Sequence, residues 1–107
     1  MEQRAIAVRV MPEFARWMGG MKGIEARSLV SMRIRRLQVG LVGDVRDVGE
    51  GVFELRINSG PGYRVYGTRS DGSSVTLLCG GDKGSQARDV ARAKRMVRAL
   101  RGGRSTL

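Results

Sequence analysis

Apolar and polar residues repeat with a regular period over most of this chain, and the period changes from one segment to the next. The segment 52–57 alternates, with Phe53, Leu55 and Ile57 pointing one way and charged residues the other. That is the period of a strand with one buried face. Four other segments predict further strands, at 4–10, 44–48, 63–66 and 75–79. The last of them is the most apolar and is expected to be central.

Three other segments repeat their apolar residues every three or four positions, which predicts amphipathic helices. The first opens at Pro12 and is ended early by glycines at positions 19, 20 and 23. The second covers residues 25–39. The third begins near Ser85, a residue type that is favoured as a helix N-cap, and Asp89 is well placed in its first turn.

The order of these elements is typical of the α+β class: a strand, two helices, three or four antiparallel strands and a final helix. A chain of 107 residues favours one domain, expected at 1–101 with a flexible tail at 102–107. The helices are expected to pack mainly on one face of the sheet, with Tyr63 turned toward that core. The opposite face then carries Glu54, Arg56, Arg64 and Tyr66.

The charge of the chain favours an acidic partner. It has 20 basic and 10 acidic residues, a net charge of +10, and most of its basic residues are arginines. Residues 1–43 and 86–107 carry the excess, while 44–85 is nearly balanced. Because arginine binds phosphate through a planar fork, nucleic acid is the favoured partner. A genome rich in arginine codons is the alternative explanation.

Composition also excludes several classes of function. The single cysteine, Cys79, lies in an apolar segment and cannot form an internal disulfide, so a buried hydrophobic role is expected. Histidine is absent, which excludes histidine acid–base catalysis and argues against a zinc site. No apolar segment approaches the ~18 residues of a membrane span, and no signal peptide is visible. We therefore expect a cytoplasmic protein with no membrane partner.

Two segments place an isolated cation beside glycines at a strand end. Residues 60–66 hold Arg64 after a Gly-Pro-Gly turn, and residues 80–86 hold Lys83 after a Gly-Gly pair. We expect these to be neighbouring strand ends, so that the two cations form a site for an anion, and a phosphodiester is the obvious candidate.

Several collinear motifs resemble one known family. They occur in the order Gly43-Asp44-Val45-Arg46, Val48-Gly49-Glu50-Gly51-Val52, Glu54-Leu55-Arg56-Ile57, 60–66, Leu77-Leu78-Cys79-Gly80-Gly81-Asp82-Lys83 and Gln86. This pattern, over roughly residues 5–100, resembles the RelE/HigB toxins of bacterial type II toxin–antitoxin modules, in the branch called addiction-module killer proteins.

The resemblance implies a RelE-like fold: a twisted, mostly antiparallel sheet with two N-terminal helices on one face and a C-terminal helix. It implies a ribosome-dependent endoribonuclease that cuts mRNA in the ribosomal A site. Because RNA carries its own nucleophile, the 2′-hydroxyl, a cluster of cations can stabilise the added negative charge without metal or other cofactor. It also implies neutralisation by a cognate antitoxin, usually a helix-turn-helix protein. Carried over by motif, Arg64 would stabilise transition-state charge, Lys83 would contact the leaving group or phosphate, and Arg56 would position the phosphate.

The remaining site residues are less closely defined. Tyr66 is a candidate for stacking on a base, and Arg46, Arg88 and Arg92 are candidate RNA contacts. Glu54 is either an ion-pair partner of Arg56 or Arg64, or a general base.

This chain also departs from the family. Some members use a tyrosine or histidine near the C-terminus for proton transfer, and here Asp89 and Arg92 lie in the corresponding helix. Arg88 is the candidate substitute.

Two other functions stay open. A ParE-like protein of the same fold would inhibit DNA gyrase by binding, although ParE-like chains generally lack the three cations Arg56, Arg64 and Lys83. A non-catalytic nucleic-acid-binding module would bind in a salt-sensitive manner without cleavage. The basic final helix is correspondingly interpreted as a ribosomal RNA contact, an antitoxin contact or a solvated face.

Overall fold

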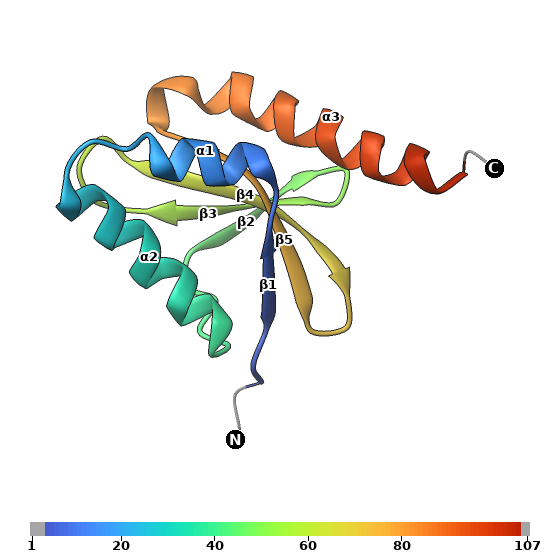
Figure 1. The fold of residues 1–107 in the computed structure, drawn as a ribbon, viewed down its shortest axis with the longest axis horizontal. Helices are drawn as coiled ribbons and strands as arrows, with labels where there is room; N and C mark the ends of the chain where they lie inside the picture. The colour runs from blue at the N-terminus through green and yellow to red at the C-terminus, as the bar shows by residue number, and fades with distance from the viewer. Residues whose placement is uncertain (1–3, 106–107) are drawn as a thin grey trace.

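The structure, a computed structural model, describes residues 4–105, and the side chains of residues 4–102. Five strands form one mixed sheet in the order β1-β5-β4-β3-β2 (Figure 1). They are β1 (Ala7–Val10), β2 (Val45–Gly49), β3 (Val52–Ile57), β4 (Tyr63–Asp71) and β5 (Ser74–Gly81). Among the strand pairs of residues 4–105, β1–β5 alone is parallel. The α+β class is confirmed, but β4 is the central strand and β5 is its neighbour.

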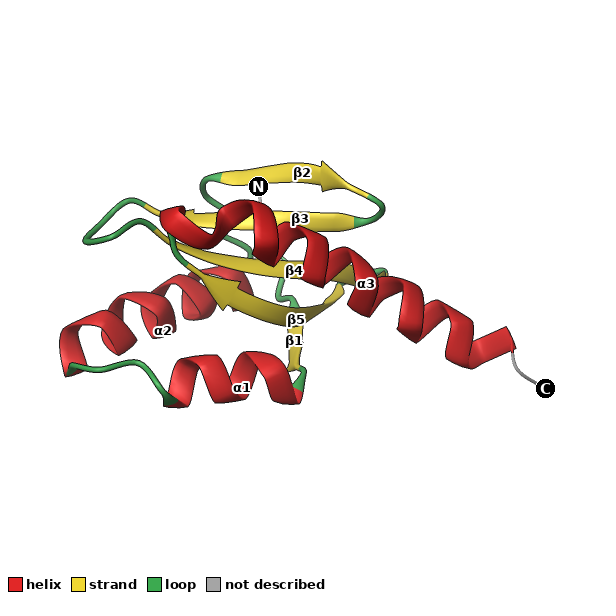
Figure 2. Cartoon of the chain, turned by 90° about the horizontal axis from the view of Figure 1, so that it is seen from above, coloured by secondary structure: helices red, strands yellow, loops and turns green. Residues whose placement is uncertain are grey.

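Helices cover both faces of the sheet (Figure 2). The helices α1 (Pro12–Gly19) and α2 (Ile24–Gln38) lie on one face, and α3 (Gln86–Ser105) lies on the other. The expectation that the helices pack mainly on one face is therefore wrong for α3. No helix in the described residues has the length and apolar character that crossing a membrane requires.

The face under α1 and α2 is an aliphatic and aromatic core. It contains Leu55 and Ile57 of β3 together with Phe14 and Val30 of the helices. Trp17 packs so close to β5 that a methyl group at Gly80 would overlap its ring. The alternation at 52–57 therefore predicted the apolar side of β3 correctly, although α3 buries the other side of the strand as well.

The face under α3 has a smaller apolar cluster. Val52, Tyr66 and Cys79 of the sheet meet Ala93 and Val97 of the helix. The start of α3 approaches β5 closely, because a side chain at Gly81 would overlap Ser85 and Asp89. Two adjacent glycines thus let different elements contact β5 from its two sides.

The entry into α3 is capped by a different residue from the one expected. A short 3-10 helix, Lys83–Ser85, precedes α3, and its N-cap is Asp82. The Asp82 side chain accepts hydrogen bonds from the backbone of Gly84 (2.8 Å) and Ser85 (3.2 Å). The Ser85 hydroxyl accepts from the Asp82 backbone N–H, which completes a reciprocal capping box, and donates to Asp89.

The far end of α3 is also longer than expected. The helix continues to Ser105, so residues 102–105 are helical rather than part of a tail, and 106–107 lie outside the described residues. Along its length, Arg98 forms an ion pair with Glu50 at 2.5 Å. Glu50 (φ 54°) and Gly51 (φ 81°) form the turn between β2 and β3. The ion pair therefore connects this turn to α3.

Candidate functional site: a cationic cluster around Glu54

Strand register collects four charged residues and one tyrosine of β2, β3 and β4 on the face that α3 covers. Glu54 is paired with Arg46 on one side and Tyr66 on the other, and Arg56 is paired with Arg64. Directly paired residues share a face, and so do residues two positions apart along a strand. The five side chains therefore form one continuous patch.

Glu54 is the centre of this patch. Its carboxylate is fully buried, and four side chains donate hydrogen bonds to it. On one oxygen the donors are Arg56 Nε at 3.1 Å and Arg64 Nη1 at 3.4 Å. On the other oxygen they are the Tyr66 hydroxyl and Gln86 Nε2, both at 3.0 Å. The interpretation of Glu54 as an ion-pair partner is confirmed for both arginines.

These contacts determine the protonation state of Glu54. Burial raises the pKa of its carboxyl, but the hydrogen bonds from Gln86, Arg56 and Tyr66 and the charge of Arg64 outweigh burial, so the pKa is lowered overall. Glu54 is therefore ionised at neutral pH, with both oxygens occupied. An occupied carboxylate with a lowered pKa is poorly suited to accept a proton, which disfavours the general-base interpretation.

The cluster carries excess positive charge. Arg56 and Arg64 share one carboxylate, which leaves one positive charge uncompensated within the trio. The Arg56 side chain is 29% exposed and the Arg64 side chain 11%. Arg64 Nε is buried and has no hydrogen-bond partner, and an unpaired buried donor costs about 1–3 kcal/mol. This arrangement favours an anion that approaches from the exposed side of Arg56.

Lys83 lies at the adjoining edge of the patch. Arg64 is paired with Gly81, two residues before Lys83, and the Lys83 backbone N–H donates to the Pro61 carbonyl at 3.4 Å. Gly62 has φ +76° and faces the Lys83 side chain. The two glycine-flanked segments are thus neighbours, as the sequence predicted, and the Lys83 side chain is exposed.

Tyr66 does not have the exposure that base stacking requires. The whole residue is buried under α3, and its hydroxyl is held by Glu54. Burial and the neighbouring Glu54 charge raise the pKa of the Tyr66 hydroxyl, so it stays protonated. The expectation of a stacking Tyr66 is corrected because α3 covers this face. Tyr63 faces the α1–α2 core, where its ring lies 6.5 Å from that of Trp17.

The three other candidate RNA contacts are exposed, but only one adjoins the cluster. Arg46 lies on the edge strand β2 directly opposite Glu54. Arg88 and Arg92 lie on the solvent side of α3. Gln86 had no role assigned from sequence, yet it joins α3 to the cluster. The sequence signal that could have indicated this role was the position of Gln86 at the start of the final helix.

Neither metal chemistry nor thiol chemistry has a basis in the described residues. Within them, no three histidine, cysteine or acidic side chains come close enough together to hold a metal ion. Cys79 is buried, and burial together with the Asp89 charge raises the pKa of its thiol to about 11. Fixed positive charge is therefore the main chemical feature of the described site.

Comparison with known proteins defines a family without naming an activity. No protein-family model matches the chain. A protein of Haemophilus influenzae, described as uncharacterized, is 42% identical over 95 residues, which is 89% of this chain and 96% of that protein. The chain therefore belongs to the same family as the Haemophilus protein.

Proposed function

We propose that this protein is a RelE/HigB-type toxin with a RelE-like fold, a ribosome-dependent endoribonuclease that cleaves mRNA and stops translation. The observation that carries the proposal is the cluster in which Arg56 and Arg64 share the buried Glu54, with Lys83 at the neighbouring strand end. The collinear motifs that resemble this family fall on the same strands and on the start of α3.

Cleavage of RNA by its own 2′-hydroxyl needs mainly fixed positive charge, which such a cluster supplies. The 2′-oxygen of one ribose attacks the adjacent phosphorus, the bond from phosphorus to the 5′-oxygen breaks, and a 2′,3′-cyclic phosphate forms. One proton leaves the 2′-hydroxyl and another reaches the departing 5′-oxygen. Fixed cations stabilise the added negative charge on the phosphate, and one such donor is worth on the order of 3–4 kcal/mol.

The exposure of each cation suggests its role. Lys83 and Arg56 are the accessible ones and would contact the phosphate or leaving group first. Arg64 lies deeper, where it adds positive charge and holds Glu54 in place. The chain lacks histidine, and the Glu54 carboxylate is fully hydrogen-bonded. Proton transfer is therefore the step for which the cluster offers the fewest suitable groups. Alignment of the mRNA by the ribosome would then supply much of the rate.

The proposed partners follow from the proposed activity. The substrate is mRNA held in a translating ribosome, and a cognate antitoxin, expected to be a helix-turn-helix protein, neutralises the enzyme. No metal or cofactor takes part in the proposed reaction.

The test is induction of the protein in translating bacterial cells, followed by mapping of mRNA 5′ ends. The proposal predicts new 5′ ends in phase with codons, and growth arrest that the Arg64→Ala variant no longer causes. Arg27→Ala, which removes an exposed arginine of α2, is the matched control and should still arrest growth. If Arg64→Ala folds and kills as well as the unmodified protein, the site assignment fails.

A second candidate function is favoured by one observation. Arg64 and Tyr66 are largely buried, as expected if the cluster only holds the sheet and α3 together. The protein would then be a non-catalytic binder, either a ParE-like inhibitor of DNA gyrase or a nucleic-acid-binding module. DNA damage with intact mRNA in the same experiment would indicate gyrase. Intact mRNA and DNA, with salt-sensitive binding to nucleic acid, would indicate the binding module.

A further inference from the structure

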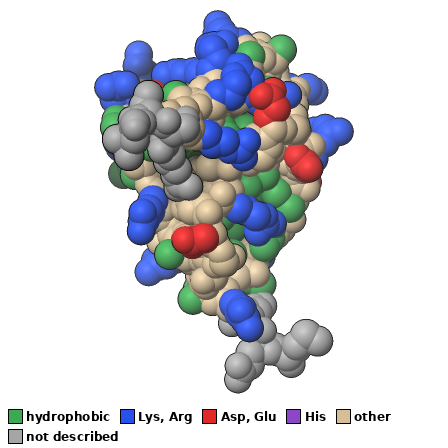
Figure 3. Space-filling model, turned by 90° about the vertical axis from the view of Figure 1, so that its right-hand side faces the viewer, with side chains coloured by type: hydrophobic (Ala, Val, Ile, Leu, Met, Phe, Trp, Pro, Cys, Tyr) green, Lys and Arg blue, Asp and Glu red, His purple; other side chains and the backbone are tan. Residues whose placement is uncertain are grey.

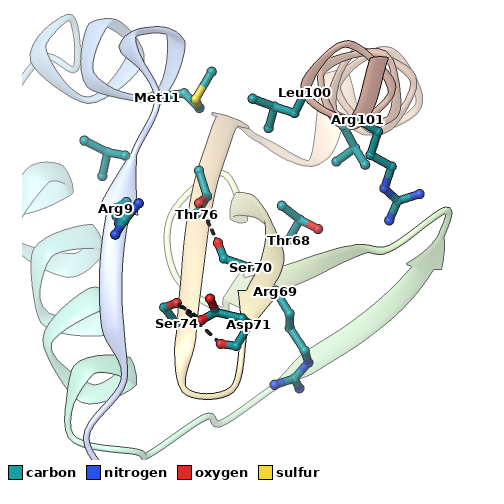
Figure 4. A pocket seen from close by; sticks show the side chains of 12 residues that line it. Arg9, Met11, Thr68, Arg69, Ser70, Asp71, Ser74, Thr76, Leu100 and Arg101 are labelled. Atoms are coloured by element: carbon teal, nitrogen blue, oxygen red, sulfur yellow. Dashed lines mark hydrogen bonds between the residues drawn. The ribbon is translucent and has the colours of Figure 1, made fainter. Parts of the chain in front are cut away.

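A separate cleft lies at the opposite end of α3 from the Glu54 cluster. Its volume is about 560 Å³, and it lies between the end of β1, the β4–β5 hairpin and the last turns of α3 (Figure 4). Gln86 contacts Glu54, and Leu100 lines the cleft. At a rise of 1.5 Å per residue of helix, Gln86 and Leu100 are about 20 Å apart. The cleft is therefore distinct from the candidate catalytic site.

Strand register determines which side chains form the floor of the cleft. Thr68 is paired with Val52, which packs under α3, so Thr68 lies on the face that α3 covers. Thr76 is paired with Thr68, and Arg9 is paired with Thr76. Directly paired residues share a face. Arg9, Thr76 and Thr68 therefore form a row across β1, β5 and β4 on the α3 side of the sheet.

Two other residues at the cleft have their side chains on the opposite face. Val10 is paired with Leu77, and Arg69 is paired with Val75. Leu77 and Val75 belong to the core under α1 and α2. The side chains of Val10 and Arg69 are therefore not part of the surface that faces α3.

The last turns of α3 form the wall of the cleft. Val97 is buried against the sheet, and Leu100 and Arg101 follow three and four positions later, on the same side of the helix. Leu100 is 41% exposed. A side chain at Gly51 would meet both Arg101 Nη2 and the Thr68 hydroxyl, so Arg101 reaches down to the end of the row.

Two arginines flank the cleft without a counter-charge. Figure 4 shows Arg9 on β1 at one side and Arg101 on α3 at the other. Within residues 4–102, neither guanidinium forms a hydrogen bond or an ion pair. Asp71 is the acidic residue of the lining, and it accepts a hydrogen bond from the Ser74 hydroxyl at 2.9 Å, at the hairpin end of the cleft. Figure 3 faces the side of the molecule where α3 ends and shows more basic than acidic side chains there.

The hydroxyl groups of the floor can donate to a ligand. The Thr68 hydroxyl donates to the Gly51 carbonyl at 2.7 Å, so it can only accept a further hydrogen bond. The Ser70 and Thr76 hydroxyls lie 2.9 Å apart, and one donates to the other. The second proton of this pair is left for an oxygen of a ligand. Phosphate oxygens accept from hydroxyl and guanidinium groups alike.

We propose that this cleft binds a small phosphate monoester that carries hydroxyl groups, such as a sugar phosphate or a mononucleotide. Its phosphate would lie over the hydroxyl groups of the floor, between the guanidiniums of Arg9 and Arg101, which bind phosphate through planar forks. Its own hydroxyl groups would donate to the Asp71 carboxylate at the hairpin end. Its carbon skeleton would contact Leu100.

The cleft fits a small ester better than a polymer. Its volume is in the range of small-molecule sites. The negative charge of Asp71 at one end would repel the next phosphate of a nucleic-acid strand. The proposal does not depend on the proposed nuclease function.

The test is isothermal titration calorimetry of the purified full chain with adenosine monophosphate and with ribose-5-phosphate. At least one of these esters should bind more tightly than inorganic phosphate, and adenosine should not bind measurably. Arg9→Gln and Arg101→Gln should each weaken binding about tenfold, and Thr76→Val several-fold. Arg95→Gln removes the same charge from an exposed position of α3 outside the cleft, and should leave binding nearly unchanged. Thermal melting of each variant verifies that it is folded.

Four outcomes would overturn the proposal. The first is that neither ester binds at millimolar concentration. The second is that adenosine or inorganic phosphate binds as tightly as the esters, which would remove one half of the proposed ligand. The third is equal weakening by Arg95→Gln and Arg101→Gln, which would indicate non-specific charge attraction. The fourth is binding of a single-stranded RNA oligonucleotide that Arg101→Gln abolishes while neither ester binds, which would assign the cleft to nucleic acid.

Discussion

The two faces of the sheet are buried by different means, although the same strands form both. Toward α1 and α2, β3 presents Leu55 and Ile57 to an apolar core. Toward α3, the same strand presents Glu54 and Arg56, and the helix covers them with Gln86. The residues Glu54 and Leu55 are adjacent in sequence and equally buried.

This difference shows what each face is suited to do. The apolar face gains stability from every buried aliphatic group. The charged face gains less, because its charges lose solvation and must be compensated by good hydrogen bonds. Retaining a buried carboxylate with two arginines is explained if the excess positive charge has a use. The comparison predicts that variants on the two faces respond differently to pH.

The largest effect is expected on the apolar face. Leu55→Ala should lower the free energy of unfolding by about 3–4 kcal/mol, through lost burial and a residual cavity. The loss should be the same at pH 7 and pH 4, because no titrating group is removed. Urea denaturation at both pH values measures it, and Met32→Ala, at an exposed position of α2, is the control. A loss below 1 kcal/mol at Leu55 would contradict the assigned core.

On the charged face, Glu54→Gln should cost about 3 kcal/mol at pH 7, because two arginines lose their shared counter-charge. The pKa of Glu54 is lower in the folded chain than the ~4.3 of an unfolded glutamate. Its contribution is therefore complete above that value and disappears as the pH falls through the folded pKa. The difference in free energy of unfolding between Glu54→Gln and the parent protein should therefore become smaller in acid.

Denaturation of Glu54→Gln from pH 7 down to pH 3 checks this narrowing. Glu50→Gln is the matched control, since its ion pair with Arg98 is exposed, and it should cost no more than about 1 kcal/mol. If the loss of free energy of unfolding in Glu54→Gln stays constant over this pH range, the carboxylate charge does not stabilise the cluster.

A smaller effect is expected where α3 meets the cluster. Gln86→Met removes the donor to Glu54 while keeping the length of the side chain, and should cost about 1.5–2 kcal/mol. Hydrogen exchange of the amides in the first turns of α3 should accelerate more than that of α2. Unchanged exchange in α3 would mean that the helix is held by its apolar residues alone.

The smallest effect concerns the entry into α3. Asp82→Ala removes the acceptor for two backbone N–H groups and should cost about 1 kcal/mol. Thermal melting compares it with Glu25→Ala, which alters an exposed residue in the first turn of α2. Equal losses of stability in Asp82→Ala and Glu25→Ala would contradict a specific capping role for Asp82.

Sequence periodicity predicted β3 and α1 because each has one clear apolar side. The alternation at 52–57 and the helical spacing after Pro12 depend on local pattern alone. Tyr66 was misplaced because its strand neighbour Arg64 is charged, and the pattern did not show that α3 would cover both. The Glu54–Gln86 bond joins residues 32 positions apart, so no local rule predicts it.

The cap at the entry into α3 shows that sequence analysis is also limited for residues that are close together in the chain. Ser85 and Asp82 are both good capping residues, and the sequence favoured Ser85. The structure uses both in one reciprocal box, with Asp82 as the N-cap. A turn with two competent residues three positions apart does not reveal which one is the cap until the backbone is known.

The central claim is that the cations around Glu54 act on an RNA phosphate. Lys83 tests it most directly, because its side chain is exposed and its removal should leave the melting temperature unchanged. The measurement is the rate at which purified protein cuts mRNA on programmed ribosomes. The account predicts that Lys83→Ala cuts about 10²–10³-fold more slowly, while Arg27→Ala cuts at the parent rate. Equal rates for Lys83→Ala and the parent protein would contradict it.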